Sequence, residues 1–287
     1  MSINIAPSRD FACHVVQTLV DAGFDAYWAG GCVRDQLMGR DPKDYDVATS
    51  ATPDQVREVF GHHRTLPIGE SFGVITVLAP KPAAPIEVAT FRRESGYSDG
   101  RHPDEVAFTN AREDALRRDF TINGMFFDPL ENVVHDFVGG QNDLQRRVIR
   151  AIGNPAERIA EDKLRMLRAI RFATTFNFEL EAECLATIQR CAAQIHLVSA
   201  ERITAELHRM LAHSHRAAAA DLLLESGLLR EVLPESPLAR LDRETASGES
   251  GRSSVRKAIR SLPDEATFSQ AMVVLLTDRP GRVTREQ

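Results

Sequence analysis

The chain has 287 residues with a net charge of −6, of which 43% are hydrophobic and 26% charged. This composition is typical of a globular protein and is long enough for two domains. The four cysteines form no C-x-x-C pair, which disfavours a zinc site or a disulfide framework and favours a cytoplasmic location. A run of about 18 apolar residues is missing, and so is a basic-then-apolar start, so we expect neither a membrane span nor a signal peptide.

The first hundred residues predict short strands alternating with helices. Periodic apolar patterns predict the helices, and β-branched runs predict the strands. Thr52, Pro53 and Gln55 form the signature of a capping box at one helix start. The polar stretch 92–108 has no periodicity, and we expect a long, functional loop there. In chain order the elements are helix 9–22, strand 26–29, helix 33–38, strand 45–48, helix 53–60 and strands 74–79 and 86–91.

The segment that begins at Gly30-Gly31 and ends at Asp46 carries the first chemical pattern. Asp44 and Asp46 are one residue apart, and a strand would direct both side chains to one face. Two close carboxylates repel each other unless a cation lies between them, and Mg²⁺ is usually bound by one or two carboxylates plus substrate phosphates. Glycines let backbone N–H groups approach a phosphate. The pattern favours two-metal phosphoryl transfer; the alternative is a surface turn with solvated acids.

Two further features of the first half bear on this chemistry. Glu87 lies on the predicted strand 86–91, where it is either a third metal ligand or an ordinary surface residue. The motif R-R-D-F-T-I-N spans 117–123 and supplies a cation for phosphate, a carboxylate acceptor and an amide that can bond a sugar hydroxyl. The alternative for this motif is an ordinary helix with a salt bridge.

The second half of the chain changes character near residue 147. Long helical patterns predict helices over 155–176, 181–195, 200–212 and 216–229, and the Pro-, Ser- and Gly-rich stretch 234–254 predicts a flexible loop. Between 146 and 171 there are eight basic residues and three acidic ones. Such a local basic stripe in an acidic protein is expected for phosphate contact, or for a solvated helix face.

A third motif, E-D-K-L-R-M-L-R-A-I-R-F, spans 161–172. If it is one helix, Asp162 and Arg165 share a face and present an acceptor beside a fork of donors, which can match the edge of a nucleotide base. Arg168 lies one turn further, where it could stack or contact phosphate. The alternative is a surface ion pair between Glu161 and Arg165, worth little energy.

Taken in order, five motifs resemble the class II tRNA nucleotidyltransferase/poly(A) polymerase family over roughly 180 residues. The resemblance implies an α+β fold: a polymerase-β-like nucleotidyltransferase head at 1–146, with a mixed sheet flanked by helices, a helical neck at 147–212 and a shortened helical body at 213–287. The motifs are G-G-C-V-R-D-Q-L-M-G with K-D-Y-D, R-R-D-F-T-I-N-G-M, D-F-V-G-G-Q-N-D-L, E-D-K-L-R-M-L-R-A-I-R-F and E-R-I-T-A-E-L.

The resemblance also implies roles for individual residues. Asp44 and Asp46 would be catalytic and would bind two Mg²⁺ ions, with Glu87 as a further candidate ligand. Two groups of residues would bind the nucleotide. The triphosphate and ribose group comprises Gly30, Gly31, Arg34, Arg118, Asp119 and Asn123, and the base-reading group comprises Asp162, Arg165 and Arg168. The implied substrates are CTP, ATP and the 3′ end of tRNA.

Local differences within the family favour one member. The stretch L-P-I-G-E-S-F-G-V-I-T-V has no arginine, unlike the basic stretch typical of poly(A) polymerases, so a CCA-adding enzyme is favoured. The loop 93–108 with Arg101 resembles the flexible loop used to switch from C to A. An enzyme that adds only A, a poly(A) polymerase and a non-catalytic RNA-binding protein are the alternatives. The chain is shorter than usual for the family, so dimerisation is one way to supply missing RNA-binding surface.

Overall fold

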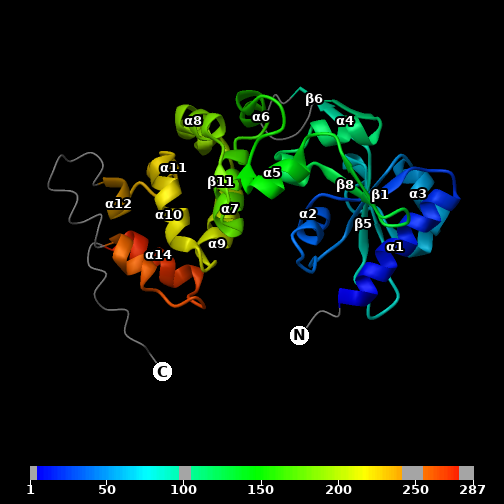
Figure 1. Ribbon diagram of the computed structural model, residues 1–287, viewed down its shortest axis with the longest axis horizontal. Helices are drawn as coiled ribbons and strands as arrows, with labels where there is room; N and C mark the ends of the chain where they lie inside the picture. Colours follow the sequence, from blue (N-terminus) through cyan, green and yellow to red (C-terminus); the bar gives the residue numbers. More distant parts are fainter. Residues whose placement is uncertain (1–4, 97–104, 241–254, 278–287) are drawn as a thin grey trace. The chain divides into compact units, whose positions relative to one another are not determined.

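The computed structural model describes residues 5–96, 105–240 and 255–277, and it separates into two compact units (Figure 1). Among the described residues, the first unit contains 5–96, 105–146 and 150–153, and the second contains 147–149, 154–240 and 255–277. Within the described residues no helix is long and apolar enough to cross a bilayer. The assignment of 147–212 as a neck and of 213–287 as a body stays a prediction.

The first unit is built on a mixed sheet. Strands β2 and β5 are parallel, and the other pairs are antiparallel. The spatial order is β3 (Thr65–Leu66), β4 (Val74–Val77), β5 (Ile86–Thr90), β2 (Asp46–Thr49), β1 (Ala26–Ala29), β8 (Met125–Asp128) and β9 (Val133–Asp136). The mixed sheet flanked by helices is the fold class that the sequence predicts.

The two faces of this sheet pack against different helices. One face is covered by α1 (Ile5–Asp21) and α3 (Pro53–Phe60) over a core that includes the fully buried Trp28. The other face is small and carries Ala48, Phe91 and Phe126, with Ala115 of α4 (Ala111–Leu116) packed on it. Because side chains alternate along a strand, Asp46 lies on the same face as Ala48. The candidate acid therefore lies on the side that α4 covers only in part.

Local signals explain why several elements begin where they do. At α3, Gln55 N–H donates to Thr52 Oγ1 and Thr52 N–H donates to Gln55 Oε1, so the predicted capping box is confirmed. Between β1 and β2, α2 (Gly31–Leu37) follows Gly30, which has φ of +72°, a conformation that glycine adopts with least strain.

The predicted long loop over 92–108 is wrong at both ends. Strands β6 (Arg92–Ser95) and β7 (Glu105–Phe108) form an antiparallel pair in which Arg92 lies opposite Phe108. The strand β7 is exposed along its whole length. Its residues therefore need no alternation of apolar and polar side chains, and the sequence does not predict a strand there. Arg101, between the two strands, lies outside the described residues.

The second unit is mainly helical. Its core helix α7 packs against α9 and α10 and buries Met166, Leu167 and Ile170. Among its described residues, the exception is a short parallel pair of strands, β10 (Val148–Ile149) with β11 (Glu179–Leu180). The helices are α6 (Pro155–Glu161), α7 (Arg165–Phe176), α8 (Ala182–Cys191), α9 (Ala200–Leu211), α10 (Arg216–Glu225), α11 (Leu228–Val232), α12 (Pro237–Arg240), a helix at 255–260 and α14 (Phe268–Leu276).

The predicted helix over 155–176 is interrupted. Asp162 has φ of −145° and ψ of 109° and ends α6, and α7 begins at Arg165. The carboxylate of Asp162 accepts a hydrogen bond from the Leu164 N–H at 3.0 Å, an arrangement by which Asp competes with helical hydrogen bonding. The prediction that Asp162 and Arg165 share one helix face is therefore wrong, because the two residues belong to different segments.

Candidate functional site

The carboxylates of the first unit gather at the start of β2. Asp46 is the first residue of that strand, whereas Asp44 lies in a bend before it, so only one of the pair has the strand geometry that the spacing predicts. Glu87 is the neighbour of Asp46 across the parallel pair β2–β5. Paired residues on adjacent strands point to the same face, so Glu87 and Asp46 share a face of the sheet.

The electrostatics of Asp46 show that these acids act on one another. The pKa of the Asp46 carboxyl is raised to about 6, because neighbouring protein removes water from it and because Asp44 and Glu87 repel its ionised form. Arg118 acts in the opposite direction. Asp46 itself is still exposed to solvent, so an ion or a substrate can reach it. A site that disfavours its own negative charge is suited to accept a cation.

The donor set fits Mg²⁺ held jointly with a substrate. Among the residues that the structure describes, no three His, Cys, Asp or Glu side chains form a ready-made metal cage. Mg²⁺ is commonly bound by one or two carboxylates together with phosphate oxygens and water. Asp44 and Asp46 match that requirement, and Glu87 stays a prediction as a third ligand.

Arg118 connects the glycine pair to the carboxylates. A Cβ built on Gly30 would lie 3.1 Å from Arg118 Nη1, so the guanidinium approaches the backbone at the point where β1 ends. Its guanidinium carbon lies 4.8 Å from the centre of the Phe126 ring, and its charge offsets part of the rise in the pKa of Asp46. The structure thus brings Gly30, Asp46 and Arg118 together from three parts of the sequence.

The other predicted phosphate and ribose residues form a buried chain of hydrogen bonds. Arg34 Nη1 donates to Asn123 Oδ1 at 2.6 Å, and Asn123 Nδ2 donates to Asp119 Oδ1 at 3.1 Å. All three residues are at least nine-tenths buried. The motif R-R-D-F-T-I-N is therefore not an ordinary helix, because η3 (Thr121–Asn123) and a turn direct Asp119 and Asn123 toward Arg34 on α2.

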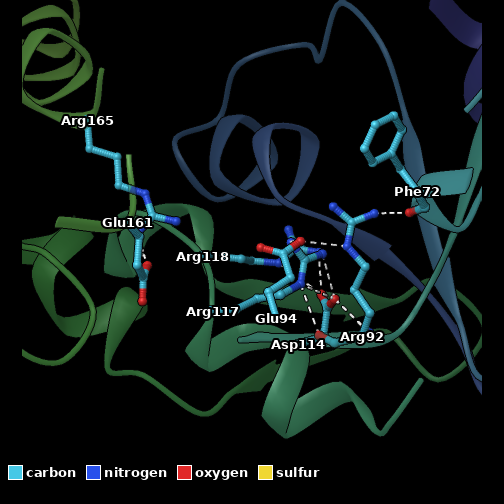
Figure 2. A network of polar contacts seen from close by, with 8 residues as sticks. All are labelled: Phe72, Arg92, Glu94, Asp114, Arg117, Arg118, Glu161 and Arg165. Atoms are coloured by element: carbon cyan, nitrogen blue, oxygen red, sulfur yellow. Dashed lines mark hydrogen bonds and ion pairs between the residues drawn. The ribbon is translucent and has the colours of Figure 1, made fainter. Parts of the chain in front are cut away.

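Two carboxylates that the sequence analysis missed hold the paired arginines (Figure 2). Asp114 bonds both Arg117 and Arg118, and Glu94 on β6 pairs with Arg117 at 3.0 Å and with Arg92 at 2.7 Å. Arg92 also donates to the carbonyl oxygen of Phe72. A sequence signal for Asp114 existed, because it precedes the two arginines by three and four residues, the spacing of helix neighbours. None existed for Glu94, which is distant in sequence.

In the second unit, the predicted base-reading residues have partners of their own. Asp162 receives Arg202 of α9, with Nη2 to Oδ2 at 2.7 Å and Nη1 to Oδ1 at 3.3 Å. Arg165 pairs with Glu161 at 2.5 Å (Figure 2), which confirms that the alternative ion pair is present. No sequence pattern predicts the pairing of Arg202 with Asp162, because 40 residues separate them.

Arg168 takes part in an aromatic cluster on α7. Its guanidinium carbon lies 5.3 Å from the centre of the Phe172 ring, and that of Arg171 lies 4.0 Å from the same ring. Arg171 is in turn paired with the buried Glu206. The predicted stacking role of Arg168 is thus directed at a protein ring in this structure, and a role toward nucleotide stays a prediction.

The mixed sheet, with Asp46 at a strand start beside Gly30 and Arg118, defines a nucleotidyltransferase head of the polymerase-β type. Comparison with protein families agrees with this class. The poly A polymerase head domain matches residues 26–150, and the probable RNA and SrmB-binding site of polymerase A matches residues 177–238. The chain belongs to the class II tRNA nucleotidyltransferase/poly(A) polymerase family.

Named relatives and solved structures support the same family. A CCA-adding enzyme of Bacillus pumilus is 41% identical over 77% of this chain and 54% of its own length. One of Oceanobacillus iheyensis is 34% identical over 92% of this chain and 62% of its own. The CTP complex of the Bacillus stearothermophilus CCA-adding enzyme aligns with a TM-score of 0.69 and 29% identity, over 94% of this chain and 69% of that one.

A further solved structure is a tRNA nucleotidyltransferase with a primer tRNA and an incoming ATP analog. It aligns with a TM-score of 0.68 and 25% identity, over 92% of this chain and 75% of that one. The chain spans little more than half the length of the curated relatives it matches.

Proposed function

We propose that this chain transfers CMP and AMP from CTP and ATP to the 3′ end of tRNA without a nucleic-acid template, as a CCA-adding enzyme. The observation that most directly supports it is that Asp46, Gly30 and Arg118 come together where β1 ends and β2 begins. The names of the relatives, CCA-adding enzymes at 34–41% identity, indicate which substrates to test first.

The head residues divide into groups with separate tasks in this proposal. Asp44 and Asp46 would hold two Mg²⁺ ions, which would acidify the RNA 3′-hydroxyl and offset the triphosphate charge. Arg118 and the backbone at Gly30 and Gly31 contact the triphosphate. The buried chain Arg34–Asn123–Asp119 fixes the ribose and phosphate contacts with little reorganisation, and such preorganised positioning supplies much of the rate in phosphoryl transfer.

The base would be chosen by the break between α6 and α7. Asp162 supplies a carboxylate acceptor that is oriented by Arg202, and Arg165 supplies donors from the first turn of α7. An acceptor beside a donor can match the edges of cytosine and adenine. Arg168 would support this pair. Reading by protein groups alone requires no template strand.

One assay separates the members of the family. The chain is incubated with Mg²⁺ and either tRNA that ends before CCA or tRNA that ends in CC, with CTP and ATP supplied singly and together, and the products are sequenced. We expect CC with CTP alone on the first tRNA, CCA with both nucleotides, and a single A on the second.

Other products would change the assignment. Addition of A only to the CC end would assign an A-adding enzyme, and long A tails would assign a poly(A) polymerase. Nucleotide binding with no incorporation into either tRNA would contradict transferase activity and favour a non-catalytic RNA-binding protein.

A further inference from the structure

The carboxylate of Asp114 is divided between two arginines. Its Oδ2 accepts from Nε and Nη2 of Arg118 at 3.1 and 2.8 Å. Its Oδ1 accepts from Nε of Arg117 at 2.9 Å and from the backbone N–H of Arg92 at 3.2 Å. Asp114 is 1% exposed, and the two arginines keep its pKa below the usual range although burial alone would raise it. A buried carboxylate with four donors is an ionised anchor.

The guanidinium of Arg118 is fixed by several contacts, of which the ion pair with Asp114 is drawn in Figure 2. Asp114 bonds one edge of its guanidinium, the ring of Phe126 lies against it at 4.8 Å, and Nη1 donates to the Asn123 carbonyl at 3.3 Å. The same Nη1 faces Gly30. A two-point bond from Nε and Nη2 fixes the plane of a guanidinium, which a single charge contact cannot do.

Arg117 has a different orientation from its neighbour. It bonds Asp114 Oδ1, Glu94 and the carbonyl of Arg92 at 3.0 Å, so it ties α4 to β6. Of the two consecutive arginines, Arg118 therefore faces Gly30, and Arg117 joins elements of the fold.

We propose that Asp114 is a positioning residue, which fixes the guanidinium of Arg118 beside Gly30 and Asp46 so that it meets a nucleoside triphosphate. The inference rests on the proposed function, because it assumes that the site accepts such a nucleotide. Asp114 does not touch the nucleotide itself. Its effect is to restrict Arg118 to the orientation in which the charge is useful.

The test compares how tightly the full chain binds CTP and CMP in the presence of Mg²⁺, by isothermal titration calorimetry. The dissociation constant for CMP divided by that for CTP reports how much the outer phosphates contribute to binding. A purely structural role of Asp114 would not change this ratio selectively. We expect Asp114→Asn to reduce this ratio about tenfold, the scale of one charge-assisted hydrogen bond. Glu113→Gln, an exposed carboxyl change on the same helix, is the matched control and should leave the ratio unchanged.

A second variant decides the question if Asp114→Asn does not fold. Arg118→Lys keeps the positive charge but cannot make the two-point bond to Asp114, so we expect the ratio to fall by a similar factor. In an Arg118→Met background, Asp114→Asn should cause no further fall, because the residue on which it acts is gone.

The outcomes separate the inference from the function on which it rests. A wild-type ratio in folded Asp114→Asn, or in Arg118→Lys, would overturn the inference while the transferase assay stays positive. A reduced ratio in both variants, in a chain that adds nothing to tRNA, would support the inference and contradict the proposed function. No preference for CTP over CMP in the wild type would overturn both.

Discussion

At the scale of single residues, Asp46 has the electrostatics expected of a cation ligand. Its pKa is raised to about 6, because folding removes water from the carboxyl and brings it close to Asp44 and Glu87. A carboxyl whose pKa is higher in the folded protein than in the unfolded chain destabilises the fold when it is ionised. The ionised carboxyl therefore destabilises the fold at this point, and a bound cation would offset that cost.

This cost predicts that Asp46→Asn stabilises the protein by an amount that depends on pH. In EDTA, the variant should melt at a higher temperature than the wild type above pH 6. The gain should shrink as the pH falls from about 6 to about 4, because the wild-type carboxyl then becomes protonated in the folded state and finally in both states. Thermal unfolding across this range measures it.

The same thermal unfolding experiment with Mg²⁺ in place of EDTA tests whether the ion stabilises the protein through Asp46. The ion should raise the melting temperature of the wild type more than that of Asp46→Asn, since binding to the folded state stabilises it. Equal shifts in the two proteins, or a destabilised variant at pH 7 in EDTA, would show that Asp46 is not part of a repulsive cation site.

Arg202 has a role that can be measured through Asp162. Its two-point bond fixes both oxygens of that carboxylate, so Arg202→Ala should lower kcat/KM for CTP and ATP about tenfold and raise incorporation of UMP and GMP. Single-turnover assays with each nucleotide measure both effects. Arg209→Ala, a 61% exposed arginine side chain on the same helix, is the control; an equal loss there would contradict a specific role for Arg202.

The sequence predicts many of the chemically important residues, but not which of them contact one another in the fold. The sequence predicts Asp44, Asp46 and Arg118 as site residues, because glycine pairs, acidic pairs and basic motifs have few other uses in combination. Asp114 could be predicted from its helical spacing to Arg117 and Arg118. The partnership of Asp162 with Arg202 could not, since it depends on how α7 and α9 pack.

At the scale of elements, the turn from β1 into α2 brings the backbone at Gly30 close to Arg118. Gly30 has φ of +72° and faces Arg118, whereas Gly31 begins a helix. The two neighbours therefore differ in what an added methyl group would meet: Arg118 Nη1 at 3.1 Å for Gly30, and Arg34 Nη2 at 3.6 Å for Gly31.

This difference predicts opposite outcomes for two matched substitutions. Gly30→Ala should destabilise the protein by about 1–3 kcal/mol, because it combines a strained backbone with displacement of Arg118. Gly31→Ala should be neutral or slightly stabilising, because alanine favours a helix over glycine by about 1 kcal/mol and the added contact is an ordinary one. Urea unfolding measures both; equal losses would show that backbone conformation at Gly30 is not limiting.

Element boundaries show where sequence patterns are ambiguous. The capping box of α3 was predictable because its hydrogen bonds involve residues three apart. The break at Asp162 was hidden by an apolar period that continues through Leu164 and Leu167, although a single carboxylate bond to the Leu164 N–H interrupts the helix. The pair β6–β7 was hidden because exposed strands need no alternation.

At the scale of the whole molecule, the overall charge is a poor guide to function. The chain carries −6, yet its arginines concentrate where carboxylates hold them: Asp114 and Glu94 in the first unit, Asp162 and Glu206 in the second. Paired arginines at fixed orientation serve recognition of phosphate and bases better than a diffuse basic surface does. Net charge therefore did not exclude an RNA substrate.

The family and the fold class were predictable from the order of five motifs, because that order is far more specific than any one of them. What each unit contributes to RNA binding was not predictable, since it depends on surfaces rather than on motifs. The chain matches relatives over only part of their length, so its activity has to be measured on this chain itself.

Transfer of labelled CMP and AMP to tRNA lacking its CCA end tests most directly whether this chain is a nucleotidyltransferase that uses Asp44 and Asp46. We compare the wild type with Asp44→Ala, Asp46→Ala and the control Asp41→Ala, an exposed acid outside the sheet. We expect Mg²⁺-dependent transfer by the wild type and the control, and a loss of at least roughly a thousandfold in the other two variants. Full transfer by Asp44→Ala and Asp46→Ala would contradict this expectation.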